Sequence, residues 1–198
     1  MKKVTFDNQA YIAPSWEEMG EVSFNLAKAI LKKNTHFDRM VALAKGGLTW
    51  SRTLADYLAI DAVSVVHIRF YKGIGETGKQ PVILQSLPVS VEGETMLLFD
   101  DVADSGETML IAKQYLTMCG AKNVKTAALF TKPWAKIKPD FTTQTTDAWI
   151  IYPHEIRETI ELLYKKWQNS IRKKEIIRRF IKLGIDKEQV EFFLKKYD

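Results

Sequence analysis

Apolar residues recur with two different spacings along the chain, and these spacings predict strands that alternate with helices. Short apolar runs, several of them rich in β-branched residues, predict strands at residues 39–44, 62–68, 95–100, 124–130 and 148–151. Apolar residues at helical spacing predict helices over residues 16–33, 48–58 and 106–119. Parallel strands joined by crossover helices give a mainly parallel sheet flanked by helices, so we expect an α/β, Rossmann-like fold.

The alternation is interrupted in one place and ends in another. Between Arg69 and Gln85 the chain has three glycines within six positions and no sustained helical period, which predicts a long connection or a hairpin that could act as a mobile lid. After Pro153 the spacing predicts amphipathic helices, the last of them capped by Asp186. We therefore divide the chain into a main domain, residues 1–157, and a basic helical C-terminal extension, residues 158–198.

Composition indicates a water-soluble protein. Of 198 residues, 46% are hydrophobic, the mean hydropathy is -0.18, and no apolar run approaches the roughly 20 residues that cross a bilayer. The N-terminal segment lacks the apolar core of a signal peptide, so we expect a cytoplasmic protein without a membrane partner. Cys119 is the single cysteine, which excludes an internal disulfide, and a small hydrophobic packing role is expected for it.

The positive charge is concentrated at the C-terminal end. Eleven basic and seven acidic residues from Glu158 onward account for +4 of the net charge of +5, so the first 157 residues are almost neutral. The basic residues of this extension alternate with isoleucines and Phe180, a pattern typical of a helix that packs one face and solvates the other. We therefore expect no nucleic-acid partner, although binding of nucleic acid by the extension stays an alternative.

The stretch FDDVADSGETM carries the clearest chemical signal. Asp100 and Asp101 follow an apolar strand, and ligands of parallel sheets collect beyond the carboxyl ends of the strands. Residues 104–108 form the turn into the next helix, where small side chains, one glycine and free backbone N–H groups suit an anion. The turn therefore predicts a phosphate site.

Two carboxylates beside a phosphate site would repel the phosphate unless another group lies between them. A sugar diol donates hydrogen bonds to carboxylates, and Mg²⁺ prefers hard oxygen ligands, so both fit Asp100 and Asp101. Together they indicate a ribose 5-phosphate. The alternative is that the acid pair ends a strand and Asp104 only caps a helix, but an apolar strand that runs into two adjacent carboxylates is uncommon.

LLFDDVADSGETM closely resembles the phosphoribosyl pyrophosphate (PRPP) signature of type I phosphoribosyltransferases. The resemblance implies that Asp100 and Asp101 face the ribose hydroxyls and Mg²⁺, and that Asp104 acts as acid or base at purine N7 or N9. It also implies that the following residues hold the 5-phosphate: Asp104, Ser105, Gly106, Glu107 and Thr108.

A second stretch, LAKGG, resembles the pyrophosphate loop of the same family. The resemblance assigns pyrophosphate binding to Ala44, Lys45, Gly46 and Gly47. It further implies that the peptide bond between Ala44 and Lys45 is cis. Taken alone, a Lys-Gly-Gly turn is weak evidence, but its order and spacing relative to the PRPP signature support the assignment.

Two further stretches, LFTKPWAKIKPDF and AWIIYPHE, resemble the purine pocket of xanthine-guanine and hypoxanthine-guanine phosphoribosyltransferases. The resemblance implies that Lys132 donates to the purine O6, that Trp149 stacks on the base and that the backbone of Ile150 reads its other edge. Glu155 would help to hold a second Mg²⁺, although the family more often has Asp there. A lysine is a donor only, so it favours a 6-oxo group over the 6-amino group of adenine.

These resemblances imply a purine salvage enzyme. It would transfer the phosphoribosyl group of PRPP to N9 of hypoxanthine, guanine or xanthine, with Mg²⁺, and it would form a homodimer or homotetramer, as is usual in the family. Two alternatives stay open. One is an adenine or orotate phosphoribosyltransferase, and the other is a PRPP-responsive regulator that binds nucleic acid with the same domain.

Overall fold

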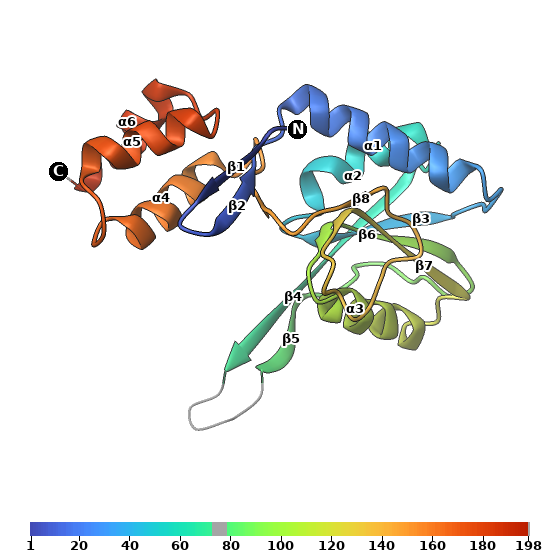
Figure 1. The fold of residues 1–198 in the computed structure, drawn as a ribbon. Helices are drawn as coiled ribbons and strands as arrows, with labels where there is room; N and C mark the ends of the chain where they lie inside the picture. Colours follow the sequence, from blue (N-terminus) through green and yellow to red (C-terminus); the bar gives the residue numbers. More distant parts are fainter. Residues whose placement is uncertain (73–78, 198) are drawn as a thin grey trace. The chain divides into compact units, whose positions relative to one another are not determined.

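The computed structural model describes residues 1–72 and 79–197, and the chain forms two compact units (Figure 1). The sheet unit consists of residues 21–146, and the helical unit consists of residues 1–20 together with 147–198. This grouping differs from the expected division at residue 157. The reason is that the N-terminal residues pair and pack with the C-terminal segment.

The sheet unit is built on six strands in the order β5-β4-β3-β6-β7-β8. They are β3 (Arg39–Ala44), β4 (Ala62–Lys72), β5 (Lys79–Gln85), β6 (Thr95–Ala103), β7 (Asn123–Thr131) and β8 (Gln144–Thr145). All neighbouring pairs are parallel except β4 and β5. The mainly parallel sheet predicted from the alternation of strands and helices is therefore confirmed.

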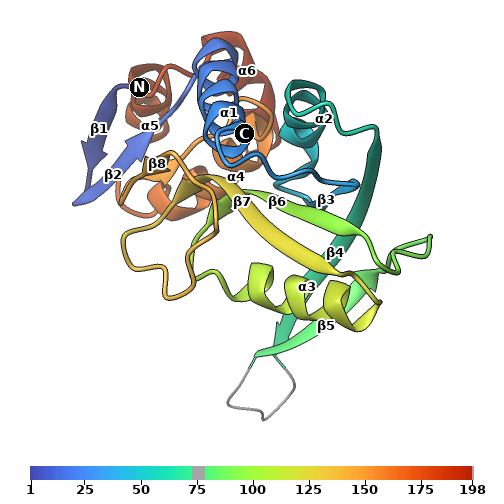
Figure 2. The ribbon, with the colours of Figure 1, turned by 90° about the vertical axis from the view of Figure 1, so that its right-hand side faces the viewer.

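Helices cover both faces of this sheet. They are α1 (Trp16–Leu31), α2 (Leu48–Tyr57) and α3 (Glu107–Met118). Figure 2 shows α2 and the part of α1 beyond Gly20 on one face, with α3 on the other. Alternate residues of β6, such as Met96 and Leu98, are buried in one cluster with Met109 and Leu116 of α3. This burial fixes the direction in which the β6–α3 turn leaves the sheet.

Local signals placed several helix ends correctly. At the start of α1, the backbone N–H of Glu18 donates to Ser15 Oγ at 3.1 Å, and the N–H of Ser15 donates to the Glu18 carboxylate at 2.9 Å. This reciprocal pair is a capping box, which a Ser followed three residues later by Glu indicates in a sequence. Asp186 likewise accepts a hydrogen bond from the N–H of Gln189 at 3.0 Å, as predicted for the cap of the last helix. Cys119 is partly buried and packs against the core beside α3.

The expected lid is partly described. Strands β4 and β5 pair antiparallel from His67 and Gln85 out to Lys72 and Lys79, so this segment is a hairpin with long arms. Residues 73–78, where the predicted lid has its glycines, lie outside the described residues. Closure of the hairpin over a ligand stays a prediction.

The helical unit has its own small sheet, in the order β1-β2-β9. Its strands are β1 (Lys3–Phe6), β2 (Gln9–Ile12) and β9 (Trp149–Ile150). Residues 148–151 were expected in the main sheet, but β9 pairs with β2 instead. The N-terminal hairpin was not predicted, although the residues of its turn could have indicated it. Asp7 and Asn8 have φ values of 48° and 63°, the left-handed conformation that Asp and Asn tolerate in tight hairpin turns.

Three helices complete this unit and share one core. They are α4 (Ile156–Trp167), α5 (Lys173–Lys182) and α6 (Lys187–Leu194), followed by a 3₁₀ turn at Lys195–Tyr197. Trp167 and Phe180 are 2% and 0% exposed and pack with Tyr11 of the N-terminal hairpin in a single cluster. Within the described part of the chain, no helix combines the length and the apolar character needed to cross a membrane.

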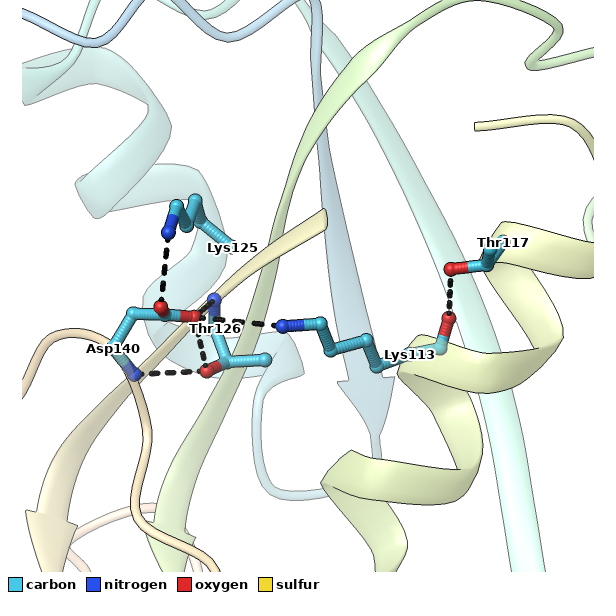
Figure 3. Close-up of polar contacts among 5 residues, drawn as sticks. All are labelled: Lys113, Thr117, Lys125, Thr126 and Asp140. Carbon is cyan, nitrogen blue, oxygen red and sulfur yellow. Dashed lines mark hydrogen bonds and ion pairs between the residues drawn. The ribbon is translucent and has the colours of Figure 1, made fainter. Parts of the chain in front are cut away.

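A partly exposed carboxylate, that of Asp140, fastens the loop after β7 to that strand (Figure 3). Asp140 Oδ2 accepts hydrogen bonds from the backbone N–H of Thr126 at 2.8 Å and from its hydroxyl at 2.9 Å. The ammonium groups of Lys125 and Lys113 lie 3.2 and 3.9 Å from the carboxylate. Burial raises the pKa of Asp140, but the hydrogen bonds and the two cations outweigh it and hold the pKa below the ordinary value.

We expect Asp140→Asn to lower the free energy of unfolding by about 1 kcal/mol at pH 7, because charge-assisted hydrogen bonds become neutral ones. A carboxyl whose pKa is lower in the folded state than in the unfolded state stabilises the fold at pH values above its unfolded-state pKa. This stabilisation is lost as the pH falls through the folded-state pKa. The gap between wild type and variant should therefore close in acid below the ordinary carboxyl pKa of 3.8. Urea unfolding at several pH values measures this difference in the free energy of unfolding.

Asp61→Asn, at an exposed position, serves as the matched control. A gap between wild type and Asp140→Asn that stays constant from neutral pH into acid would contradict the assignment of the stabilisation to the ionised carboxylate.

Candidate functional site

The turn after β3 has the backbone that the resemblance implied. The peptide bond between Ala44 and Lys45 is cis, so this prediction is confirmed. The N–H of Gly47 donates to the carbonyl of Leu43 at 2.8 Å, and the N–H of Leu48 donates to the carbonyl of Lys45 at 3.1 Å. Gly47 is the N-cap residue of α2. The four residues predicted to bind pyrophosphate thus form one tight strand-to-helix turn.

This turn lies directly against the acid pair of β6. A Cβ atom added to Gly46 would lie 2.2 Å from Oδ1 of Asp101 and 3.0 Å from Oδ1 of Asp100. A Cβ atom on Gly47 would lie 2.6 Å from the carbonyl oxygen of Phe99. The position of Gly47 therefore requires glycine, because a side chain there would press on the backbone of β6, and a side chain at Gly46 would displace the carboxylates. Two motifs more than 50 residues apart in the sequence meet here.

The acid pair lies inside β6 and not at its end, which corrects the expected boundary at Asp100. Pairing of β6 with β7 continues to Ala103, whereas pairing with β3 ends at Phe99. One edge of β6 beyond Phe99 is thus held by β7. The other edge faces the turn that follows β3.

Burial and mutual repulsion determine the electrostatics of the pair. Burial first, and then the neighbouring charge of Asp101, raise the pKa of Asp100 well above its ordinary value. The backbone N–H groups of Asp101 and Gly47 oppose this shift but do not offset it. The ionised form of Asp100 is thus costly, and a bound cation or hydroxyl donor would stabilise it.

The chemistry of this donor set fits Mg²⁺. Magnesium is usually held by one or two carboxylates together with substrate phosphate oxygens and water, not by a closed protein cage. In residues 1–72 and 79–197, no cluster of three or more His, Cys, Asp or Glu side chains could hold a metal ion. Asp100 and Asp101 supply two carboxylates of the kind that Mg²⁺ accepts as ligands.

The predicted phosphate turn lines a pocket together with Asp100, the first residue of the acid pair. The pocket has an empty volume of ≈ 300 Å³, part of which is open solvent, and is lined by Asp100, Val102, Ala103, Asp104, Ser105, Gly106, Thr108 and Met109. Gly106 begins α3 with a φ of 84°, and a Cβ atom there would lie 2.1 Å from the carbonyl oxygen of Ile137. Only glycine permits this conformation and this contact. The pocket thus opens at the positive end of a helix.

Lys132 lies beside this turn, in the loop after β7. Its side chain is buried, and its backbone N–H donates to the carbonyl of Ala103 at 3.0 Å. No role was predicted from the sequence for Trp134, two residues further on. Its indole N–H donates to Asp104 Oδ1 at 2.8 Å. The sequence feature that could have indicated a role for Trp134 is its position close to Lys132, which was predicted to bind the base.

The remaining predicted site residues belong to the helical unit. Trp149 and Ile150 form β9, where the Trp149 side chain is 46% exposed and that of Ile150 is 8% exposed. Glu155 is the N-cap residue of α4. Their expected roles in stacking on the base, reading its edge and binding a second metal ion rest on the resemblance alone.

Comparison with known proteins assigns the chain to a family. Residues 15–157 match the phosphoribosyl transferase domain. The chain belongs to this family. Its C-terminal residues 158–198 lie outside the match, so helices α5 and α6 are not part of the family domain.

Two relatives of the phosphoribosyl transferase domain illustrate the likeness. The xanthine-guanine phosphoribosyltransferase of Gluconobacter oxydans is 26% identical over 145 residues, which cover 72% of this chain and 83% of that protein. The crystal structure of a purine phosphoribosyltransferase from Pyrococcus horikoshii is 28% identical, with a TM-score of 0.65, and the likeness covers 73% of this chain and 93% of that one.

A third relative binds a nucleotide. A protein from Neisseria gonorrhoeae, solved with bound ppGpp, is 26% identical, with a TM-score of 0.66. The likeness covers 73% of this chain and 89% of that chain. The phosphoribosyl transferase fold of the present chain is therefore shared with proteins of known structure over most of their length.

We expect Gly47→Ala to lower the free energy of unfolding by about 1–3 kcal/mol, because the new methyl group would press on the backbone of β6. Urea denaturation of the purified variant measures this loss. The matched control is Gly20→Ala in α1, where a Cβ atom meets nothing within 4 Å. The control should gain about 0.5–1 kcal/mol from better helix propensity. Equal stabilities of the two variants would contradict the close approach of the turn to β6.

Proposed function

We propose that this protein is a Mg²⁺-dependent purine phosphoribosyltransferase that transfers the phosphoribosyl group of PRPP to N9 of a 6-oxopurine. The products would be the nucleoside 5'-monophosphate and pyrophosphate. The observation that carries the proposal is the meeting of three features at one edge of the sheet: the Lys45–Gly47 turn, the acid pair and the pocket at the start of α3. The names of the similar proteins support the purine as acceptor.

Each feature has a role in binding PRPP. The turn at residues 104–108 would bind the 5-phosphate with backbone N–H groups at a helix N-terminus. Asp100 and Asp101 would accept hydrogen bonds from the ribose hydroxyls. The turn from Ala44 to Gly47 would donate backbone N–H groups to the pyrophosphate. When bound, Mg²⁺ would supply positive charge that stabilises the departing pyrophosphate.

The acceptor is defined by a lysine and a carboxylate. Lys132 would donate to O6 of the purine and so favour hypoxanthine, guanine or xanthine over adenine. Asp104, which lines the pocket, would exchange a proton with purine N7 or N9 as the bond to the ribose forms. No covalent intermediate on the protein is needed. Fixed donors around the developing charges would supply most of the catalysis.

We expect transfer to a 6-oxopurine when the purified chain is assayed with PRPP, Mg²⁺ and one base at a time. Because Lys132 cannot accept a hydrogen bond, kcat/KM for adenine should be lower by a factor on the order of 100 or more. Formation of nucleoside monophosphate, separated by chromatography, measures each rate. Preference for adenine or orotate would favour the alternative enzyme, and no product with any base would refute the transferase assignment.

We expect Asp104→Asn to lower kcat by roughly 100-fold or more, because the proton transfer is lost while the phosphate turn stays intact. The dissociation constant of PRPP, measured by calorimetry, should change little. The control variant is Asp61→Asn, at an exposed position outside the site. A kcat for Asp104→Asn close to that of the wild type would contradict the acid or base role of this residue.

The rival function, a regulator that binds nucleic acid, depends on the basic residues of α5. Ile176 and Phe180 of this helix are fully buried in the core of the helical unit. Arg179 forms an ion pair with Asp7 and lies 5.1 Å above the ring of Trp167. One face of α5 is therefore committed to packing, which supports a structural role for the helix.

We expect only non-specific binding of DNA or RNA, with dissociation constants in the range of about 10⁻⁴–10⁻⁶ M at physiological salt. Gel-shift titrations at two salt concentrations test this with the wild type and with a double variant, Arg172→Gln and Lys174→Gln, at exposed positions. Submicromolar binding that the double variant loses would favour the regulator. Removal of the whole extension is a poorer test, because Phe180 and its neighbours pack on Tyr11.

A further inference from the structure

Trp134 contacts the side chain that the proposed function makes the acid or base. Its indole Nε1–H donates a hydrogen bond to Oδ1 of Asp104 at 2.8 Å. The two residues are 30 positions apart and come from the loops that follow β7 and β6. An indole N–H can only donate, so the contact specifically restrains a carboxylate oxygen.

The same indole contacts the residue predicted to read the base. The ammonium group of Lys132 lies 5.6 Å from the centroid of the Trp134 ring. This distance is within the range of a cation–π interaction. One side chain thus touches both groups that the proposed function places at the purine.

The backbone around Trp134 is fastened on both sides. The N–H of Lys132 donates to the carbonyl of Ala103 at 3.0 Å, and the N–H of Ile137 donates to the carbonyl of Ser105 at 3.3 Å. Both acceptors belong to the segment that carries Asp104. The indole therefore starts from a position that is fixed relative to the carboxylate, as precise positioning of a reacting group requires.

Core packing does not explain this tryptophan. Its side chain is 55% exposed, whereas Trp50 and Trp167 are 5% and 2% exposed. An exposed tryptophan contributes little to stability by burial. What Trp134 adds at this position is its hydrogen bond to Asp104 and its contact with Lys132.

We propose that Trp134 is a positioning residue for Asp104: its N–H holds one carboxylate oxygen and leaves the other available for the proton of the purine. This inference rests on the proposed function and adds a residue to its site. Misplacement of a reacting group by a fraction of an ångström lowers the rate strongly, so loss of this hydrogen bond should reduce kcat without affecting the phosphate and pyrophosphate turns.

The test removes the donor and keeps an aromatic ring beside Lys132. Trp134→Phe should lower kcat by about tenfold, the factor that corresponds to one hydrogen bond to a charged group. KM for PRPP should stay within about twofold, because the substitution keeps the backbone N–H groups that the proposed function assigns to the phosphate and the pyrophosphate. A chain that carries benzothienylalanine at position 134 keeps the indole shape without the N–H, and it should show the same loss of kcat.

A double-mutant cycle separates positioning from a structural role. If Trp134 acts through Asp104, Trp134→Phe should cause no further loss of kcat in an Asp104→Ala background. The matched control is Trp16→Phe, since Trp16 is 56% exposed in the helical unit. Circular dichroism melting checks that each variant is folded.

Two results would overturn the inference while the proposed function stands. One is an active wild type whose kcat is unchanged by Trp134→Phe. The other is a double-mutant cycle in which Trp134→Phe lowers kcat by the same factor with and without Asp104→Ala. A folded wild type that transfers phosphoribosyl groups to no purine is a different result. It refutes the proposed function, and the inference with it.

Discussion

The candidate site depends on the close approach of two backbone segments, the Gly46–Gly47 turn and the end of β6. The pairing of β6 with β3 ends at Phe99, whereas its pairing with β7 continues to Ala103. The acid pair therefore stays in an ordered strand, but one edge of that strand has no strand neighbour there. The turn after β3 occupies that edge so closely that a side chain on Gly47 would clash with the backbone of β6 and one on Gly46 with the carboxylates. The proposed pyrophosphate donors and ribose acceptors are thereby brought together in the fold itself, and preorganised donors of this kind need no rearrangement during a reaction.

The loop after β7 adds a second constraint, because it connects the two residues proposed to act on the purine with the turn proposed to bind the 5-phosphate. Its beginning is bonded to Ala103 and Ser105, and Asp140 ties its far end to Thr126 of β7. A loop held at both ends can place Lys132 and Trp134 reproducibly beside Asp104. Discrimination between purines by a donor at O6 requires such a fixed position, since a mobile lysine would adapt to other bases.

The basic C-terminal helices have a structural explanation that does not involve a ligand. They bury Trp167, Ile176 and Phe180 against the N-terminal hairpin, and the lysines and arginines on the remaining surface keep this face in water. The net positive charge of the protein is thus a property of a packed helical unit. The chemistry that the family relationship suggests is concentrated in the other unit.

The sequence by itself determined the elements and motifs that depend on neighbouring residues. The period of the apolar residues located the strands and helices of the sheet unit, and side chains three positions apart located the caps at Ser15 and Asp186. The PRPP signature and the Lys-Gly-Gly turn were readable for the same reason, since each is a short segment with its own backbone requirements. Only the tertiary structure decided that β9 pairs with β2, that β6 continues past the acid pair, and that Trp134 reaches Asp104. These features depend on which segments meet in space, and the free energy of such meetings comes from burial and hydrogen bonds between residues far apart in the chain.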